Sequence, residues 1–229
     1  MMKALERLSW SHYALTMILV GQFDSPFARR VAVTLNHYRM PYTRNPISVF
    51  RDMDEMQKIN PLVRVPSLVL ESGEVLIDSS AIIDHLDEMA GPARALTPPH
   101  GPERRKVLQA VVLAHGLMDK CVALSYQRLF HSDKHINRDF EKRMMQQITA
   151  ALHKLEHDCG APWFFDGKMT QADITTGCLL GYMKMRVPDM FPADKYPKLH
   201  HLALHCEATE EFVKARASPD ETVPGQTQD

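Results

Sequence analysis

The apolar positions of the N-terminal half alternate between short runs and helical spacings. Residues 17–20 form a fully apolar run that ends at Gly21, which is typical of a buried strand. Residues 26–39 carry apolar side chains near helical spacing. Ser25 followed by Pro26 favours a helix start, because Ser suits the N-cap and Pro the first helical position. The pattern therefore predicts a strand followed directly by a helix.

Five further segments complete this half, in the order edge strand, short polar helix, strand, strand and capped helix: 41–47, 51–59, 65–70, 75–77 and 78–90. Proline confines the first of them to a sheet edge. The turn sequence ESGE, which contains Gly73, joins the last two strands. The order β-α-β-α-β-β-α predicts a compact α/β layer structure.

The pattern changes after the Pro- and Gly-rich stretch GPARALTPPHGP, beyond which only helical periodicity remains. Helices are expected over five segments: 103–130, 137–158, 170–186, 197–206 and 207–217. The expected organisation has five parts: a flexible extension over 1–16, an α/β domain over 17–93, a linker over 94–102, an all-helical bundle over 103–217 and a disordered tail over 218–229.

Composition and charge narrow the classes of function. The chain has 229 residues, of which 45% are hydrophobic and 24% charged, and its formal net charge is −1. This balance is ordinary for a soluble globular protein and gives no field for binding nucleic acid or an anionic membrane. The sequence contains no run of eighteen apolar residues, so no membrane span is expected.

The cysteines and histidines predict neither disulfides nor a metal site. The four cysteines are widely spaced without a C-x-x-C pattern, which is typical of reduced thiols in a cytoplasmic protein: Cys121, Cys159, Cys178 and Cys206. His201 and His205 are four residues apart beside His200, but no acidic partner completes a known metal motif.

Three short motifs have a structural and a functional interpretation. Ser25 is either only a helix cap or the working group of an active site. Val65-Pro66 is either an ordinary trans pair at a strand start or a cis pair. Asp78-Ser79 is either a helix cap or a binding group. A fourth motif, Thr170 to Asp173, predicts a capping box, which is a folding element.

The ordered set of motifs resembles the glutathione transferase family. The matching phrases are SPFARRVAVTL, INPLVRVPSLVLESGEVLIDSSAIIDHLDE and MTQADITTGCLLGYM, and the resemblance covers about residues 17–215. It implies a thioredoxin-like N-terminal domain, an all-helical C-terminal domain and glutathione in the cleft between them. It also implies a homodimer.

The resemblance further implies roles for individual residues. Ser25 stands where the family has its thiol-activating hydroxyl or cysteine, so it would hydrogen-bond the glutathione sulfur and favour the thiolate, aided by the helix N-terminus at Pro26. The backbone of Val65, before a cis Pro66, would pair with the cysteinyl part of glutathione. Ser79 would hold the γ-glutamyl carboxylate.

For other positions the resemblance implies a role with less agreement between this sequence and the family. Asp78 would accept from the γ-glutamyl ammonium group, although it is one methylene shorter than the family's usual Glu. Arg51, Lys58 or Arg64 would face the glycyl carboxylate, or else solvent. Val63 stands where the family usually has Gly, and a β-branched residue resists φ > 0, so the loop before Pro66 is expected to take a different path.

The expected partner of glutathione is a small hydrophobic electrophile. Four residues would line its pocket, although their spacing equally suits a helix core: Phe23, His115, Met118 and Tyr126. The leading hypothesis is a cytoplasmic glutathione S-transferase-like enzyme with glutathione as co-substrate and no metal. The alternatives are a glutathione-dependent cis–trans isomerase, a disulfide reductase, which needs a cysteine where Ser25 stands, and a non-catalytic binding module.

Overall fold

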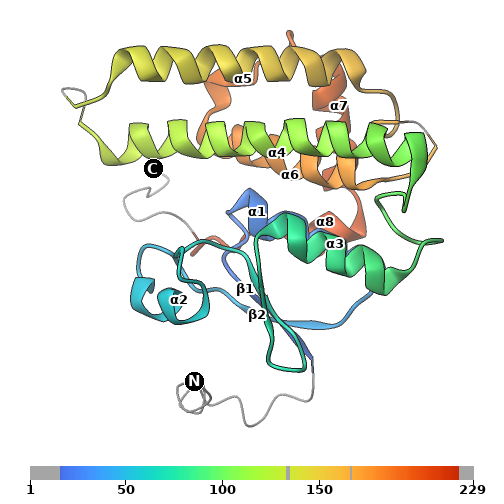
Figure 1. The fold of residues 1–229 in the computed structure, drawn as a ribbon. Helices are drawn as coiled ribbons and strands as arrows, with labels where there is room; N and C mark the ends of the chain where they lie inside the picture. The colour runs from blue at the N-terminus through green and yellow to red at the C-terminus, as the bar shows by residue number, and fades with distance from the viewer. Residues whose placement is uncertain (1–15, 133–134, 166, 222–229) are drawn as a thin grey trace.

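An α/β layer and a helical layer make up the chain in the computed structural model, which describes residues 16–132, 135–165 and 167–221 (Figure 1). The lower layer in Figure 1 contains β1 (Met17–Val20), α1 (Pro26–Tyr38), β2 (Tyr42–Asn45), α2 (Met53–Ile59), β3 (Ser67–Val69), β4 (Val75–Ile77) and α3 (Ser79–Ala90). The helical half contains α4 (Gly101–Phe130), α5 (Arg138–Asp158), α6 (Gln171–Arg186), the 3-10 turn η2 (Pro188–Met190), α7 (Pro197–Glu207) and α8 (Glu210–Lys214).

A four-stranded sheet in the order β2-β1-β3-β4 is the centre of the α/β layer. β1 and β2 are parallel, with Met17 opposite Tyr42, whereas β3 is antiparallel to both β1 and β4. The sheet order places β2 at an edge, so the predicted edge strand is confirmed. The order of strands and helices is also the predicted one.

β1 buries both of its faces, as its fully apolar sequence predicts. Met17 and Leu19 belong to the main core, while Ile18 and Val20 pack with Met56 of α2 in a second, smaller core. Successive side chains of a strand point to opposite faces, so one apolar run supports both cores. The loop that follows β1 therefore leaves the sheet from a strand that is fixed on both sides.

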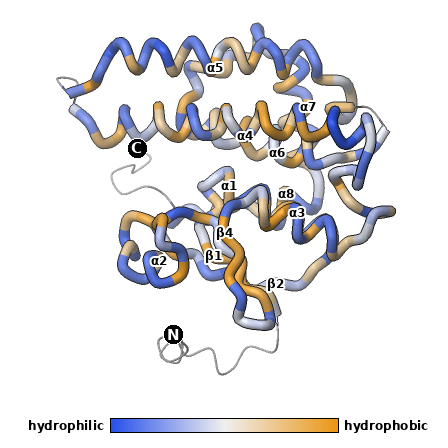
Figure 2. The backbone as a smooth tube through the Cα atoms, in the orientation of Figure 1, coloured by the Kyte–Doolittle hydropathy of each residue, from blue (hydrophilic) through white to orange (hydrophobic). Residues whose placement is uncertain are grey.

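The helical half packs around α4 and α6. In Figure 2 α5 is mostly hydrophilic, whereas apolar positions concentrate in α4 and α6. α4 packs against both α5 and α6, and α1 packs against α6, so the main core runs through both halves. Within the described part of the chain, α4 is long and apolar enough to cross a membrane by length and composition alone. Here Leu117, Met118 and Leu124 of α4 are buried in the core.

Two glycines of α6 allow neighbouring helices to approach closely. A Cβ on Gly177 would lie 2.8 Å from the ring of Phe212, and a Cβ on Gly181 would lie 2.8 Å from Nη1 of Arg29. The Arg29 guanidinium donates to both carboxylate oxygens of Glu207, at 2.6 and 2.8 Å. Arg29 therefore joins α1 of the α/β layer to α7 of the helical half.

The sequence predicts the helices of the second half well, except at the C-terminus. Four of the five expected helices begin and end within two residues of their predicted positions. The segment expected as one helix over 207–217 is shorter, because Ala208 ends α7 and Thr209 begins α8. The predicted linker 94–102 lies between α3 and α4 except for its last two residues, which begin α4.

The predicted disordered tail is wrong for residues 218–221. Glu221 is 4% exposed and forms an ion pair with Arg44 of β2. This contact joins residues that are far apart in the sequence, and the polar composition of the segment gave no sign of it. The remainder of that tail, 222–229, and all but the last residue of the predicted extension 1–16 lie outside the described residues.

α6 begins with the predicted capping box. The Thr170 hydroxyl accepts from the N–H of Ala172 at 3.3 Å, and the Asp173 carboxylate accepts from the N–H of Thr170 at 2.7 Å. Asp173 also accepts from the N–H of Phe164 at 2.6 Å. The acid therefore fixes the preceding loop as well as the helix start.

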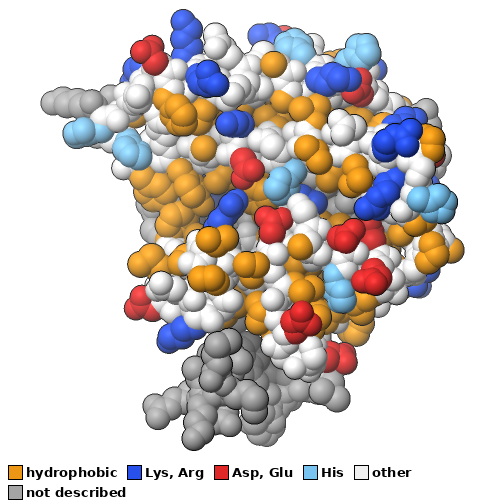
Figure 3. All heavy atoms as spheres, in the orientation of Figure 1, with side chains coloured by type: hydrophobic (Ala, Val, Ile, Leu, Met, Phe, Trp, Pro, Cys, Tyr) orange, Lys and Arg blue, Asp and Glu red, His pale blue; other side chains and the backbone are white. Residues whose placement is uncertain are grey.

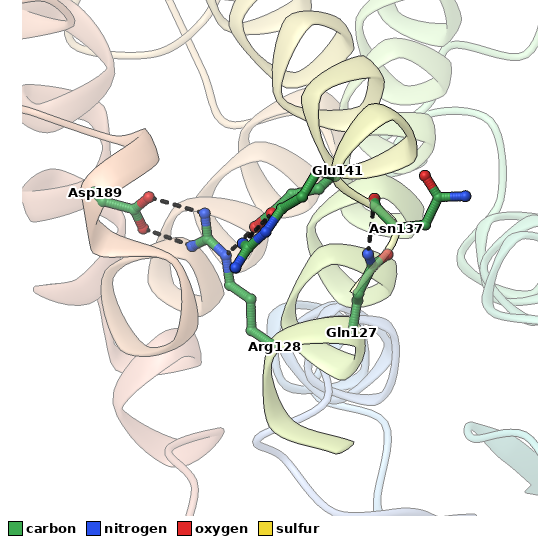
Figure 4. Close-up of polar contacts among 6 residues, drawn as sticks. Gln127, Arg128, Asn137, Glu141 and Asp189 are labelled. Atoms are coloured by element: carbon green, nitrogen blue, oxygen red, sulfur yellow. Dashed lines mark hydrogen bonds and ion pairs between the residues drawn. The ribbon is translucent and has the colours of Figure 1, made fainter. Parts of the chain in front are cut away.

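Arg128, in the last turn of α4, joins three helical segments (Figure 4). Its guanidinium donates to both carboxylate oxygens of Asp189 in η2, at 2.9 and 3.1 Å, and to Glu141 of α5 at 3.2 Å. Arg138 donates to the same Glu141 at 3.0 Å. Burial alone raises the pKa of Glu141, but the two arginines outweigh it and hold this pKa below its usual range.

Replacing Arg128 with methionine is expected to lower the free energy of unfolding by about 2 kcal/mol, because Glu141 loses a charged partner. Urea unfolding measures the change. Lys154→Met is the matched control, since it breaks an exposed pair with Asp158 and should cost less than about 0.5 kcal/mol. The lowered pKa of Glu141 means that its pair stabilises the fold above the unfolded pKa and that this contribution is lost as pH falls through the folded pKa. Equal losses in the two variants would contradict this account.

Candidate active site

Ser25 is the N-cap of α1, in the loop that leaves β1. Its backbone is extended, and its carbonyl accepts from the N–H of Arg29 at 2.9 Å. Its hydroxyl accepts from the N–H of Ala28 at 3.4 Å, which is long for a hydrogen bond. The helix start at Pro26 is as predicted. The Ser25 hydroxyl therefore accepts only a weak capping hydrogen bond, and its own proton remains available for donation to a ligand.

Val65 and Pro66 are joined by a cis peptide bond, as the family resemblance implied. The pair lies beside the end of β1, because a Cβ on Gly21 would be 2.9 Å from the Cβ of Val65 and 3.3 Å from that of Ala28. Gly21 has φ +136°, a conformation that side chains disfavour. Gly21 therefore allows Val65 to lie next to the loop that carries Ser25.

A cavity of about 280 Å³ opens between the two halves beside Ser25. The loop after β1 forms one wall, and Ile47, Val49, Phe50 and residues 63–65 form the next. The helical half contributes Val122 and Tyr126 of α4 and Tyr182 and Arg186 of α6. The cavity therefore has a largely apolar lining and the Ser25 loop at one side.

A smaller cavity of about 50 Å³ adjoins the first, since three residues line both: Phe27, Arg64 and Val65. Pro66, Asp78 and Ser79 are among its other lining residues. Ser79 is 1% exposed, and its hydroxyl has no hydrogen-bond partner within the described residues. The two cavities thus adjoin between the N-terminus of α3 and that of α1, two helix ends that favour negative charge.

Asp78 is the N-cap of α3, with φ +66°. One carboxylate oxygen accepts from the N–H of Ser80 at 2.8 Å. Burial alone raises the pKa of Asp78, but the hydrogen bonds from Ser80 and the nearby charges of His115 and Arg30 hold it below its usual range. Asp78 is therefore an anion, and capping leaves its second oxygen available to a cation.

Of the three cations predicted to face the glycyl carboxylate, only Arg64 lies at the two cavities. Arg64 lines both cavities, and its guanidinium is 3.4 Å from the carboxylate of Asp119 in α4. Arg51 is exposed in the turn before α2, and Lys58 is exposed on α2. Neither of them lines the two cavities, and on α2 it is Met56 that packs in the second core.

Val63 has φ +49°, the left-handed conformation that its β-branched side chain was expected to prevent. The expected resistance of valine to φ > 0 is therefore wrong at this position, whereas the different loop path stays a prediction. Asn60 holds the loop, because its side chain accepts from the N–H of Leu62 at 3.0 Å and donates to the carbonyl of Arg64 at 2.8 Å. Val63 also packs against the second core, and these contacts offset the backbone strain.

Three of the four residues predicted for the electrophile pocket do not line the larger cavity. Phe23 is buried with its ring under the guanidinium of Arg44, 3.6 Å from the ring centroid. Met118 is fully buried in the core, and His115 lies outside the lining. For Met118 the packing of α4 decides for the core, whereas His115 is half-buried with its ring 5.2 Å from that of Phe27. Tyr126 does line the cavity.

The larger cavity contains groups that the sequence did not indicate. Arg186, at the end of α6, donates to Asp24 at 3.2 Å, and its side chain is 2% exposed. Phe50 also lines this cavity. Its ring and that of Phe130, which lies outside the lining, contact Tyr126 and each other, with ring centroids 5.2 to 5.6 Å apart. Figure 3 shows apolar side chains gathered near the C-terminal end of α4 and over the adjoining part of the α/β layer. The only available signal was the position of Asp24 next to Ser25.

The cysteines and histidines offer no competing centre within the described residues. Burial raises the pKa of Cys121 and Cys178 to about 12, so both remain protonated thiols. No cysteine lines the two cavities described above. His200 stacks on Phe191, and no group of three or more metal-ligating side chains occurs in the part of the chain that the structure describes.

Replacing Gly21 with alanine is expected to destabilise the fold by about 2 kcal/mol, because a Cβ clashes with Val65 and the backbone stays at an unfavourable φ. The same clash should displace Val65 and weaken glutathione binding. Gly73→Ala is the matched control, since Gly73 has φ +83° but no atom within 4 Å of an added Cβ. Urea unfolding and calorimetric titration with glutathione measure both effects. Equal results for the two variants would exclude the steric explanation.

Comparison with known proteins agrees with this geometry. Residues 19–94 match the model of the glutathione S-transferase N-terminal domain. A probable maleylacetoacetate isomerase 1 of Drosophila melanogaster is 34% identical, with 96% of this chain and 91% of that protein covered. The uncharacterised GST-like protein YibF of Escherichia coli is 27% identical, over 74% of this chain and 83% of that protein.

A solved structure supports the same assignment. A glutathione transferase family member from Pseudomonas fluorescens Pf-5 with bound glutathione is 26% identical, has a TM-score of 0.79, and covers 89% of this chain and 100% of its own. The predicted fold class, a thioredoxin-like N-terminal domain followed by a helical domain, is thereby confirmed. The chain belongs to the glutathione S-transferase family.

Proposed function

We propose that this chain is a glutathione-dependent transferase that activates the glutathione thiol with Ser25 for attack on a small hydrophobic electrophile. The observation that carries the proposal is that two cavities share the lining residues Phe27, Arg64 and Val65. Ser25 lines one of them, and Asp78 and Ser79 line the other. An extended tripeptide with an anionic end and a thiol suits a groove with a helix N-terminus at each end.

The γ-glutamyl end of glutathione would lie at α3. The Ser79 hydroxyl, which has no partner among the described residues, can hydrogen-bond the carboxylate there. The second oxygen of Asp78 can accept from the ammonium group. Val65 lies before β3, so its backbone N–H and carbonyl can pair with the cysteinyl residue as an added strand does. Arg64, which lines both cavities, supplies a cation for the glycyl carboxylate.

The thiol would lie at α1, where two features favour its ionised form. The Ser25 hydroxyl donates a hydrogen bond to the sulfur, and the N-terminus of α1 adds partial positive charge. The thiol releases its proton to solvent, and the resulting thiolate attacks an electrophilic carbon and forms a carbon–sulfur bond. The bond from that carbon to the leaving group breaks, and the leaving group departs as an anion with the bonding pair. Ser25 remains unmodified throughout.

The electrophile would enter the larger cavity. Phe50, Tyr126 and Tyr182 line it, together with aliphatic side chains, and suit a flat apolar molecule. The acceptor side therefore keeps only Tyr126 of the predicted set, because Phe23, His115 and Met118 do not line the cavity.

A second candidate is a glutathione-dependent cis–trans isomerase. Relatives at 34% and 28% identity have the names probable maleylacetoacetate isomerase 1 and maleylacetoacetate isomerase. In this reaction the thiolate adds to a double bond, the new single bond rotates, and the thiolate leaves again. The same Ser25 and the same groove serve both reactions, because each requires a stabilised thiolate.

Titration with glutathione followed by activity assays tests the proposal. We expect binding below millimolar concentration, conjugation of 1-chloro-2,4-dinitrobenzene, and loss of that activity in Ser25→Ala. Cis-to-trans conversion of maleyl-type substrates without net consumption of glutathione would favour the isomerase. Absence of glutathione binding at millimolar concentration would overturn both and favour a non-catalytic binding module. We also propose a cytoplasmic homodimer, which sedimentation of the purified chain tests for its oligomeric state.

A further inference from the structure

The chain after α8 returns from the helical half to the α/β layer (Figure 1). It ends, within the described residues, at Glu221, whose side chain is buried. One carboxylate oxygen accepts from the backbone N–H of Phe23 at 2.5 Å. The other pairs with Arg44 of β2 and accepts from the N–H of Ser218 at 3.3 Å. Glu221 therefore bonds to three separate parts of the chain.

Phe23 belongs to the loop that carries Ser25. The guanidinium of Arg44 also covers the Phe23 ring at 3.6 Å from its centroid, so Glu221 and Arg44 fix this residue through its backbone and its ring. The next residue, Asp24, accepts a hydrogen bond from Arg186 of α6 at 3.2 Å. Two ion pairs from outside the loop thus fix the two residues that immediately precede Ser25.

The burial of Glu221 is costly unless it is fully paired. A buried carboxylate requires charged or hydrogen-bonded partners. This one lies near a second carboxylate, because burial and then the charge of Glu221 raise the pKa of Asp24. Its partners offset that cost only while Phe23 and Arg44 stay in place. The Glu221 carboxylate and the loop that contains Phe23 therefore stabilise each other's positions.

We propose that Glu221 is a positioning residue for Ser25, which acts through the backbone of Phe23 and holds the hydroxyl where the glutathione sulfur would lie. The inference rests on the proposed function, because it presumes that Ser25 meets that sulfur. Glutathione affinity depends mainly on Val65, Asp78 and Ser79, which lie on other segments. Loss of Glu221 should consequently reduce turnover and leave affinity nearly unchanged, since small displacements of a reacting group reduce rates strongly.

The test compares Glu221→Ala with Glu211→Ala in the full-length protein. Glu211 of α8 is the matched control, because it also reaches from the helical half to α1, where it lies 3.3 Å from His37 at the end remote from Ser25. We expect Glu221→Ala to lower kcat with 1-chloro-2,4-dinitrobenzene by roughly tenfold. The dissociation constant for glutathione should change less than about threefold, and Glu211→Ala should alter neither quantity. Glu221→Gln, which can still accept from Phe23, should retain part of the rate.

A double-mutant cycle with Ser25→Ala separates positioning from general destabilisation. If Glu221 acts through Ser25, adding Glu221→Ala to Ser25→Ala should cause no further loss of kcat. An undiminished loss in the Ser25→Ala background, or an equal loss in Glu211→Ala, would overturn the proposal. Thermal unfolding checks that each variant is folded. If Glu221→Ala does not fold, Glu221→Gln takes its place in the cycle. Failure of the wild type to bind glutathione would instead refute the proposed function.

Discussion

Ser25→Ala is expected to lower kcat for glutathione conjugation by roughly 10- to 100-fold, because a hydrogen bond to a charged group contributes about 1.5–3 kcal/mol. The affinity for glutathione should change less than about threefold, since the γ-glutamyl and cysteinyl backbone contacts remain. The measurements are steady-state kinetics with 1-chloro-2,4-dinitrobenzene and calorimetric titration with glutathione. The bound thiol should also titrate at higher pH, because its ionised form loses a donor.

The capping role of Ser25 requires its own control. Its bond to the N–H of Ala28 is 3.4 Å long, so losing the cap should cost only about 0.5 kcal/mol, at the weak end for N-caps. Asn137→Ala removes a comparable cap, at 3.1 Å from Phe140, from α5 and should leave kcat unchanged. Ser25→Thr keeps the hydroxyl and should retain most of the activity. Activity of Ser25→Ala equal to that of the wild type would assign thiol activation to another group.

Asp173→Ala is expected to lower the free energy of unfolding by about 3 kcal/mol, the largest stability effect predicted for this chain. The fully buried carboxylate accepts three hydrogen bonds, from the N–H of Phe164 at 2.6 Å and from the N–H and hydroxyl of Thr170 at 2.7 and 2.9 Å. Removal leaves the N–H of Phe164 without an acceptor and removes half of the capping box. Urea unfolding measures the loss, and refolding should also be slower.

Asp139→Ala is the matched control for Asp173. Asp139 is likewise an acid in the first turn of a helix, α5, but it is exposed. Its loss should cost less than about 0.5 kcal/mol, the range of helix-dipole effects at a surface. A change of that size for Asp173→Ala as well would mean that the loop around Phe164 relaxes and finds another acceptor.

Much of the fold could be predicted from local sequence. The apolar run 17–20, the Ser25-Pro26 helix start and the Thr170–Asp173 box follow from rules that act within a few residues, and the structure agrees with each. The site was partly predictable for a different reason, because the ordered motifs resemble those of the glutathione transferase family. Val65, Pro66, Asp78 and Ser79 lie at the ends of elements whose order alone brings them together.

Packing between segments that are far apart in the chain could not be predicted from the sequence. His115 and Met118 lie on the same helix as Tyr126, but only Tyr126 lines the larger cavity, because the crossing of α4 over its neighbours selects the exposed face. The backbone of Val63 was unpredictable for a similar reason. The hydrogen bonds of the Asn60 side chain impose a conformation there that valine disfavours.

The sequence by itself determined the elements, their order and the helix N-termini at Ser25 and Asp78, because spacing, caps and prolines are local properties of the chain. Only the tertiary structure decided that Arg186 meets Asp24 and that Glu221 reaches Phe23. These contacts join residues 162 and 198 positions apart. Their pairing depends on how α6 and the C-terminal segment pack against the α/β layer, and no local pattern encodes that arrangement.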